Sequence, residues 1–217
     1  MNSRKRIQLL HLCSNVFPTG IFSHSFGYEM MLEDGRATDM ETYEQYLTGI
    51  LQMGGARAET AVVRFVYEQP ERIQEWDELC TALKAAKELR MASSKTGKAF
   101  LRTFHKMYPD NPLKNVTLVH TNYCVVFGSV CRFLEIPVEE MLEAYLTSSL
   151  LSYIQVGIKL IPLSQMDGQL LMYRCYPQIE KCVEEAMKAK EDICSFNPVV
   201  DIASMRHEIQ FSRMYMS

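Results

Sequence analysis

The sequence predicts an all-α protein, a single-domain bundle of roughly nine to ten helices, and three observations support this fold class. Apolar residues recur at spacings of three and four along most of the chain, which is the period of a helix with one buried face. Proline and glycine separate these segments and leave short connections, as in antiparallel bundles. Strand signals are weak, because no alternating runs flank a hairpin turn.

The first two predicted helices lie on either side of a glycine pair. One covers 39–53, with Asp39 as its N-cap and the pair Gly54-Gly55 at its end. The second covers 57–68 and continues the same apolar spacing. The apolar stripe of the helix over 39–53 consists of five residues, Tyr43, Tyr46, Leu47, Ile50 and Leu51.

Prolines indicate the boundaries of the next pair. Pro70 suits the first position of a helix, so we predict a helix over 71–88. Another helix covers 89–107 and ends before Pro109, because proline lacks the N–H that a helix interior requires.

The second half of the chain contains three more predicted helices. Segment 116–135 is apolar nearly all round, which predicts a central buried helix. Pro137 starts a helix that runs toward Leu160 and ends at Pro162. A final long helix is predicted over 164–190.

Size and composition define the class of protein. A chain of 217 residues, 47% apolar and 23% charged, predicts one domain over 1–217, with a helical body at 1–196 and a C-terminal tail at 197–217. The net charge of −3 argues against nucleic-acid binding. No run approaches the length of a membrane span, and the apolar stretch 7–13 is too short for a signal peptide. We therefore expect a cytoplasmic protein that binds neither nucleic acid nor membrane.

Seven cysteines and five histidines are the candidates for metal or nucleophilic chemistry. No Cys-x-x-Cys pair occurs, and we expect seven reduced thiols. No two histidines lie three or four residues apart, and the pair His11 and Cys13 does not complete a site, so we predict no metal ligand and no tightly bound cofactor. Cys124 and Cys131 lie in the most apolar segment, where a thiol stays protonated and inert.

Two segments differ from the helical pattern. One is 17–27, a turn rich in aromatic residues, and the other is the tail. Asp201 is expected to cap a short tail helix with Ile202, Met205 and Ile209 along one face. A helix this short is marginal in water, so the tail should order only when it docks on its own body or on a partner. From the residues alone, a partner-binding anchor and a solvated tail are equally well supported.

Four segments match one family in order and spacing. The tail reads Ser-Met-Arg-His-Glu at 204–208, then Phe-Ser-Arg at 211–213 and a final serine. The early turn reads Pro-x-Gly-x-Phe-Ser-x-Ser-x-Gly-x-Glu over 18–29. The other two are Gly-Ile-Lys-Leu-Ile-Pro-Leu-Ser-Gln at 157–165 and Ala-Lys-Glu-Leu-Arg at 86–90. Together these segments resemble the UreF family of urease accessory proteins.

The resemblance implies a homodimeric, all-α protein that is not an enzyme. It implies binding to the accessory protein called UreD or UreH and recruitment of the GTPase UreG, with modulation of GTP hydrolysis as a further expectation. The assembled complex would handle nickel and insert it into apo-urease. The alternatives are a direct nickel carrier with His or Cys ligands on this chain and, less favoured, a small helical enzyme that uses a Cys–His pair.

The early turn and the tail supply the residues that the resemblance implies for partner binding. They are Phe22, Ser23, His24, Ser25, Ser204, Met205, Arg206, His207, Glu208, Ser212, Arg213 and Tyr215. Among them, the family's arginine at the position of Arg213 matters for assembling the complex that recruits the GTPase.

Overall fold

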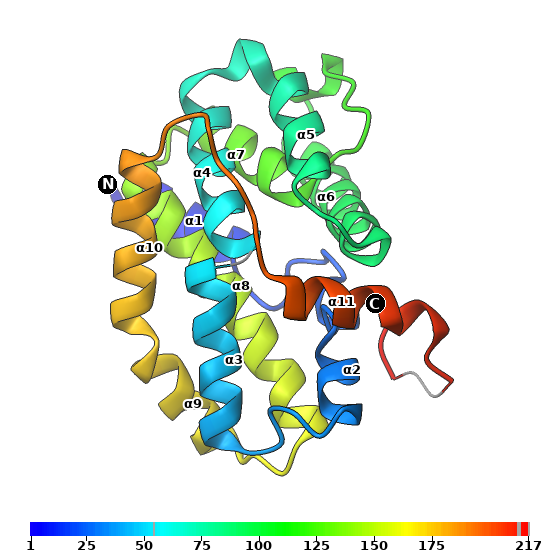
Figure 1. Cartoon of the computed structure of the whole chain (residues 1–217). Helices are drawn as coiled ribbons and strands as arrows, with labels where there is room; N and C mark the ends of the chain where they lie inside the picture. Colours follow the sequence, from blue (N-terminus) through cyan, green and yellow to red (C-terminus); the bar gives the residue numbers. More distant parts are fainter. Residues whose placement is uncertain (54, 212–213, 217) are drawn as a thin grey trace.

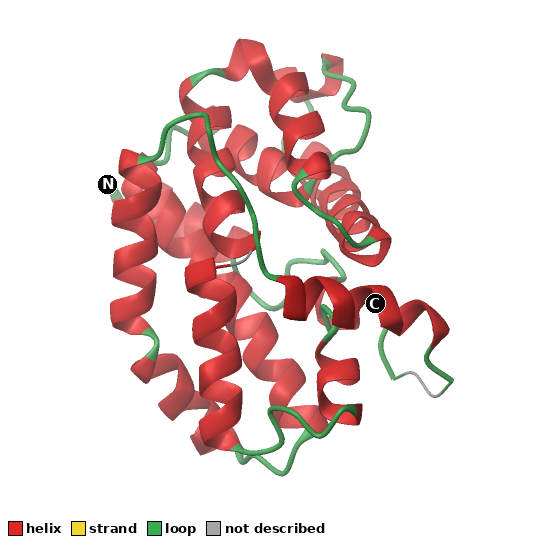
Figure 2. Cartoon of the chain, viewed as in Figure 1, coloured by secondary structure: helices red, strands yellow, loops and turns green. Residues whose placement is uncertain are grey.

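The computed structural model describes residues 1–53, 55–211 and 214–216. Within these residues the chain forms helices joined by loops, with no strand (Figure 2). The all-α prediction is therefore confirmed. None of the described helices combines the length and the apolar character needed to cross a lipid bilayer.

The elements are numbered in chain order (Figure 1). The α-helices are α1 (Ser3–Leu12), α2 (Tyr28–Glu33), α3 (Met40–Met53), α4 (Gly55–Glu68), α5 (Ile73–Ala82), α6 (Lys87–Met107), α7 (Tyr123–Phe133), α8 (Val138–Leu160), α9 (Gln165–Arg174), α10 (Tyr176–Lys188) and α11 (Pro198–Arg206). Short 3-10 helices are η1 (Ile21–Ser23), η2 (Pro70–Arg72), η3 (Pro112–Asn115) and η4 (His207–Ile209).

Two helices begin where the sequence predicts. The Asp39 carboxylate accepts the backbone N–H of Thr42 at 2.9 Å, so it caps the first turn of α3. Pro137 directly precedes α8, which runs to Leu160 as predicted. Both boundaries depend on local chemistry, which a sequence displays directly.

The prediction of one helix over 71–88 is wrong, because a short break separates α5 from α6 within this range. The Arg90 guanidinium on α6 donates to the carbonyl oxygens of Lys84 and Ala85, at 2.6 and 2.8 Å. A side-chain donor thus satisfies carbonyl groups in the break between the two helices.

The predicted buried helix over 116–135 is shorter in the structure, because its first part is a loop. The Asp77 carboxylate on α5 accepts the backbone N–H groups of His120, Thr121 and Asn122, at 2.8, 3.0 and 2.8 Å. These bonds replace the helical hydrogen bonds of that segment, and α7 begins only after them.

The long helix predicted over 164–190 is two helices that meet at Cys175. Pro177 lies in the first turn of α10, where its missing N–H is tolerated, so the chain turns there. Ser164 caps α9, because its side chain accepts the N–H of Asp167 at 3.1 Å while the Asp167 carboxylate accepts the Ser164 N–H at 2.8 Å.

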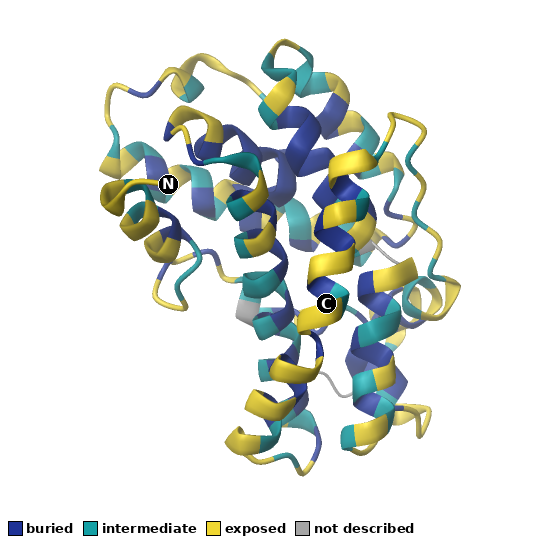
Figure 3. Ribbon diagram, turned by 90° about the vertical axis from the view of Figure 1, so that its left-hand side faces the viewer, coloured by how far each residue is buried: buried dark blue, intermediate teal, exposed yellow. Residues whose placement is uncertain are grey.

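The core is built around α4, which packs on α3, α5, α7, α8 and α10. Along α7 the residues from Tyr123 to Cys131 are buried, as its apolar sequence predicts (Figure 3). A Cβ atom at Gly128 would lie 2.7 Å from the carbonyl oxygen of Val63, so α7 rests directly on the backbone of α4. At the other end of the chain, α11 returns to pack on α2 and α6 (Figure 1).

Candidate functional site

The tail lies against the early turn of the same chain, and a glycine makes this approach possible. Gly27 has a φ of 85°, and a Cβ atom there would lie 2.6 Å from Ser204 Oγ and 2.9 Å from Ser204 N. Helix α11 therefore packs on bare backbone, at a position that favours glycine for its conformation as well as for its size.

A buried carboxylate on α2 holds the end of the tail. Glu29 Oε2 lies 3.0 Å from His207 Nε2, and both residues are buried. The same carboxylate accepts the backbone N–H of Met214 at 2.7 Å and that of Tyr215 at 3.1 Å. We call this set of contacts the tail dock. Three hydrogen bonds to one buried acceptor make Glu29 its central residue.

Exposed ion pairs around the tail dock add little to its stability. Arg206 lies 2.6 Å from Asp34, and Lys87 lies 3.3 Å from Glu208. Water screens exposed pairs of this kind, so they contribute little to stability. The buried bonds to Glu29 therefore dominate the hydrogen bonding that positions the tail.

The structure brings the two predicted partner-binding segments together, although the sequence separates them by most of its length. The early turn and the tail share a backbone hydrogen bond, from Met216 N to the carbonyl oxygen of Ser23, at 2.8 Å. Five of the predicted residues are buried in this contact region or beside it: His24, Ser25, Ser204, His207 and Tyr215. Their contact with a partner stays a prediction.

Other predicted residues face solvent or fall outside the description. Met205, Arg206 and Glu208 are exposed. Ser212 and Arg213 lie outside the described residues, and so does the side chain of Phe22.

Asn197, rather than Asp201, caps the tail helix. The Asn197 side chain accepts the N–H of Val200 at 3.3 Å. Asp201 instead lines a cavity, and burial raises the pKa of its carboxyl group above the ordinary value. The predicted cap at Asp201 is therefore wrong, because the helix begins about one turn earlier.

The predicted apolar face of the tail points to solvent. Ile202 is 55% exposed, Met205 47% and Ile209 84%. Phe211 and Met214 are among the further large apolar side chains of the tail that are exposed. We define the outer face of the tail by these five residues: Ile202, Met205, Ile209, Phe211 and Met214.

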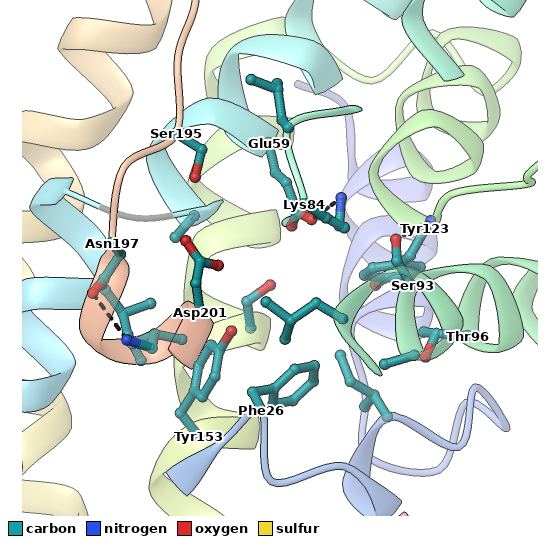
Figure 4. A pocket seen from close by; sticks show the side chains of 18 of the residues that line it. Phe26, Glu59, Lys84, Ser93, Thr96, Tyr123, Tyr153, Ser195, Asn197 and Asp201 are labelled. Atoms are coloured by element: carbon teal, nitrogen blue, oxygen red, sulfur yellow. Dashed lines mark hydrogen bonds and ion pairs between the residues drawn. The ribbon is translucent and has the colours of Figure 1, made fainter. Parts of the chain in front are cut away.

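A cavity of about 100 Å³ lies beside the docked tail (Figure 4). Asn197 and Asp201 from the tail line it on one side, and Phe26 from the early turn closes another part. Glu59 and Lys84 lie opposite, where their side chains meet in an ion pair of 2.6 Å (Figure 4).

Sequence reasoning missed a cluster behind that ion pair. Lys84 Nζ donates to Cys80 Sγ at 2.8 Å, and Cys80 Sγ lies 3.0 Å from Cys124 Sγ. We call Glu59, Cys80, Lys84 and Cys124 the thiol–lysine cluster. Its members come from three helices and the break after α5, so no local spacing in the sequence indicates it.

Two of the other thiols, the half-buried Cys13 and the buried Cys131, keep their protons. Burial raises the pKa of the Cys13 thiol to about 12 and that of Cys131 well above its ordinary value. These thiols are protonated at neutral pH, which makes them poor nucleophiles and poor metal ligands.

Acid should weaken the fold through His24. Burial, together with the charge of Lys95, lowers the pKa of His24 from 6.5 to about 4. Between these values the unfolded chain binds the proton and the folded chain does not, so stability falls as the pH drops from 6.5 to 4. The contribution of this residue is at most about 3 kcal/mol. Urea unfolding at pH 7 and pH 4.5 measures it, and most of the difference should disappear in His24→Asn but persist in the control His11→Asn, at an exposed histidine.

Comparison with known proteins agrees with the resemblance of the motifs. A profile of the UreF family matches residues 37–176. The urease accessory protein UreF of Nostoc sp. is 33% identical, over 97% of this chain and 95% of that protein. Those of Arthrobacter sp. and Corynebacterium glutamicum are each 31% identical, over 98% and 96% of this chain and 97% and 96% of their own lengths. The chain belongs to the UreF family of urease accessory proteins.

Proposed function

We propose that this protein is a non-catalytic assembly factor for urease whose tail binds partner proteins. The partners are a UreD/UreH-type accessory protein and a UreG-type GTPase, and a homodimer of this chain forms the platform for them in the cytoplasm. The complex handles nickel as cargo, delivers it to apo-urease and modulates GTP hydrolysis. The observation that supports this proposal is the outer face of the tail, five large apolar side chains held in place yet exposed.

Incomplete hydrogen bonding in the tail dock also favours partner binding. In and beside the tail dock, the buried atoms Ser204 Oγ, His207 Nδ1 and Tyr215 OH have no hydrogen-bond partner among the described residues. Each unsatisfied buried group costs roughly 1–3 kcal/mol. The docked tail is therefore only moderately stable, and a protein that covers it or remodels it gains free energy.

The direct carrier alternative needs a ligand set on this chain. Among the described residues, Glu59, Cys80 and Cys124 place three potential ligand atoms within 4.8 Å of one another. Lys84 Nζ already lies against two of these groups, at 2.6 Å from Glu59 and 2.8 Å from Cys80. The ammonium group thus already neutralises the negative charge of the groups that would bind a metal ion. This favours the assembly role over the carrier role.

Introducing a negative charge on the outer face of the tail should weaken partner binding without unfolding the protein. We expect Ile209→Asp to reduce co-purification of the GTPase and of the UreD/UreH-type protein at least tenfold, because about 2 kcal/mol of apolar burial is lost. The helical circular dichroism spectrum should not change, since Ile209 is 84% exposed.

The matched control is Met166→Asp on α9, a methionine that is 66% exposed and distant from the tail in sequence. It should leave co-purification at the wild-type level. Wild-type recovery of both partners with Ile209→Asp, or with a chain truncated before Pro198, would contradict the proposed function.

A further inference from the structure

The thiol–lysine cluster lies outside the tail dock and the outer face of the tail, and it combines groups with a defined chemistry. Cys80 and Cys124 are completely buried, and their Sγ atoms are 3.0 Å apart although 44 residues separate them in sequence. We propose that Cys80 and Cys124 form a redox-active dithiol that closes to a disulfide between α5 and α7.

The surroundings of Cys80 favour the reactive form of its thiol. Burial alone raises the pKa of Cys80, but the hydrogen bond with Cys124 and the positive charge of Lys84 outweigh burial and lower the pKa below its ordinary value. Burial and the neighbouring Cys80 raise the pKa of Cys124 well above its ordinary value. Of the two thiols, Cys80 is therefore the one that ionises more readily, and Cys124 beside it keeps its proton. The thiolate is the nucleophile in oxidation, and the thiol is the group that closes the disulfide.

A small peroxide is the oxidant that suits a buried site. The Cys80 thiolate attacks one peroxide oxygen, the O–O bond breaks, and the leaving hydroxide takes a proton to become water. Cys124 Sγ then attacks the sulfenic sulfur of Cys80, the S–O bond breaks, and the hydroxyl leaves as a second water with the proton of Cys124. In total, two thiols and one hydrogen peroxide give one disulfide and two water molecules.

The cavity provides the approach for this oxidant. The side chains of Lys84 and Glu59 line the cavity wall (Figure 4), and Lys84 Nζ lies 2.8 Å from Cys80 Sγ. A neutral peroxide that enters the cavity therefore meets a side chain that contacts Cys80 directly.

The thiol–lysine cluster suits a metal ion less well than it suits a redox-active dithiol. The two sulfurs and the Glu59 carboxylate offer three donors, but the Lys84 ammonium hydrogen-bonds Cys80 and pairs with Glu59. A bound metal ion would have to displace this charge or be repelled by it. The geometry therefore favours a dithiol over a metal site.

Peptide mapping of the full-length protein tests the proposal directly. Reduced protein is treated with hydrogen peroxide at pH 7, quenched with acid, alkylated, digested and examined by mass spectrometry. We expect one dominant cross-linked pair that joins Cys80 to Cys124 and that dithiothreitol removes. Because the link closes a long loop, it should also raise the melting temperature by roughly 5–10 °C.

Variants separate the roles of the individual groups. Cys131→Ser, a buried cysteine on the same helix α7, should keep the link. Cys124→Ser should lose it and leave Cys80 as a sulfenic acid that dimedone traps. Lys84→Met should slow oxidation at pH 7 about tenfold and recover the rate at higher pH, because less thiolate is present without the lysine charge.

Two results would overturn the proposal. One is a peroxide-treated wild-type chain in which both cysteines are still alkylated, or in which cross-links are spread over other cysteine pairs. The other is stoichiometric zinc binding by the reduced chain with protection from peroxide, which would identify a metal site. No partner protein takes part in these measurements, so their failure leaves the proposed function untouched.

Discussion

Replacing Glu29 with alanine is expected to release the tail while the helical body stays folded. The substitution leaves the imidazole of His207 and the backbone N–H groups of Met214 and Tyr215 without their buried acceptor. A hydrogen bond to a charged group contributes about 1.5–3 kcal/mol, so three lost bonds exceed what the exposed ion pairs supply. The isolated tail is too short to keep its helix, and it should fray once it is undocked.

Hydrogen exchange measured by mass spectrometry resolves this effect along the chain. Amides of residues 207–211 and 214–216 should exchange on the order of 100-fold faster in Glu29→Ala, while those of α4 and α7 keep their protection. Co-purification of the GTPase should fall as well, since the outer face loses its fixed position.

The matched control is Glu33→Ala on the same helix. Its carboxylate accepts a single exposed bond from Gln210 Nε2, at 2.8 Å. This variant should show wild-type exchange across most of the tail. Unchanged protection of the tail in Glu29→Ala would show that the tail dock does not depend on this carboxylate.

Replacing Asp77 with alanine is expected to lower the free energy of unfolding by about 4 kcal/mol. The buried carboxylate accepts the three backbone N–H groups of the loop before α7 and the side-chain amide of Asn122, at 2.9 Å. Thr121 in this loop has a φ of 60°, a conformation that a β-branched residue adopts only where its surroundings impose it. Without the carboxylate, three buried donors and one partly buried donor lose their acceptor, and the strained residue loses its support.

Urea unfolding followed by circular dichroism measures this loss. Asp192→Ala, at an exposed aspartate outside the helices, is the control and should lie within about 0.5 kcal/mol of wild type. Domains of this kind are stable by only about 5–15 kcal/mol, so a lower melting temperature and a lower soluble yield are further readouts for Asp77→Ala. A free energy of unfolding within about 1 kcal/mol of the wild-type value would contradict the assigned role of Asp77.

Local patterns predicted the helices whose signals are local. The stripe and the cap of α3 lie within one short segment, and Pro137 defines the start of α8 by its own chemistry. The break inside 164–190 was also readable, since Pro177 lies in the sequence and proline is tolerated only in the first turn of a helix. The prediction of one helix over 164–190 is wrong because the apolar spacing continues across a proline that begins a new helix.

Other boundaries depend on residues that are distant in sequence. The loop before α7 exists because Asp77 on another helix accepts its N–H groups, and the periodicity of 116–135 contains no trace of that carboxylate. The thiol–lysine cluster was invisible for the same reason, since Cys80 and Cys124 meet only when α5 packs on α7.

The sequence by itself determined the all-α class, the family motifs and the apolar face of the tail, because each depends on residues a few positions apart. Only the tertiary structure decided what those features contact. It placed Glu29 under the tail, turned the outer face to solvent and brought two thiols together beside a lysine. Helical spacing reports which side of a helix is apolar, whereas a buried carboxylate or thiol takes its partner from whichever helix packs against it.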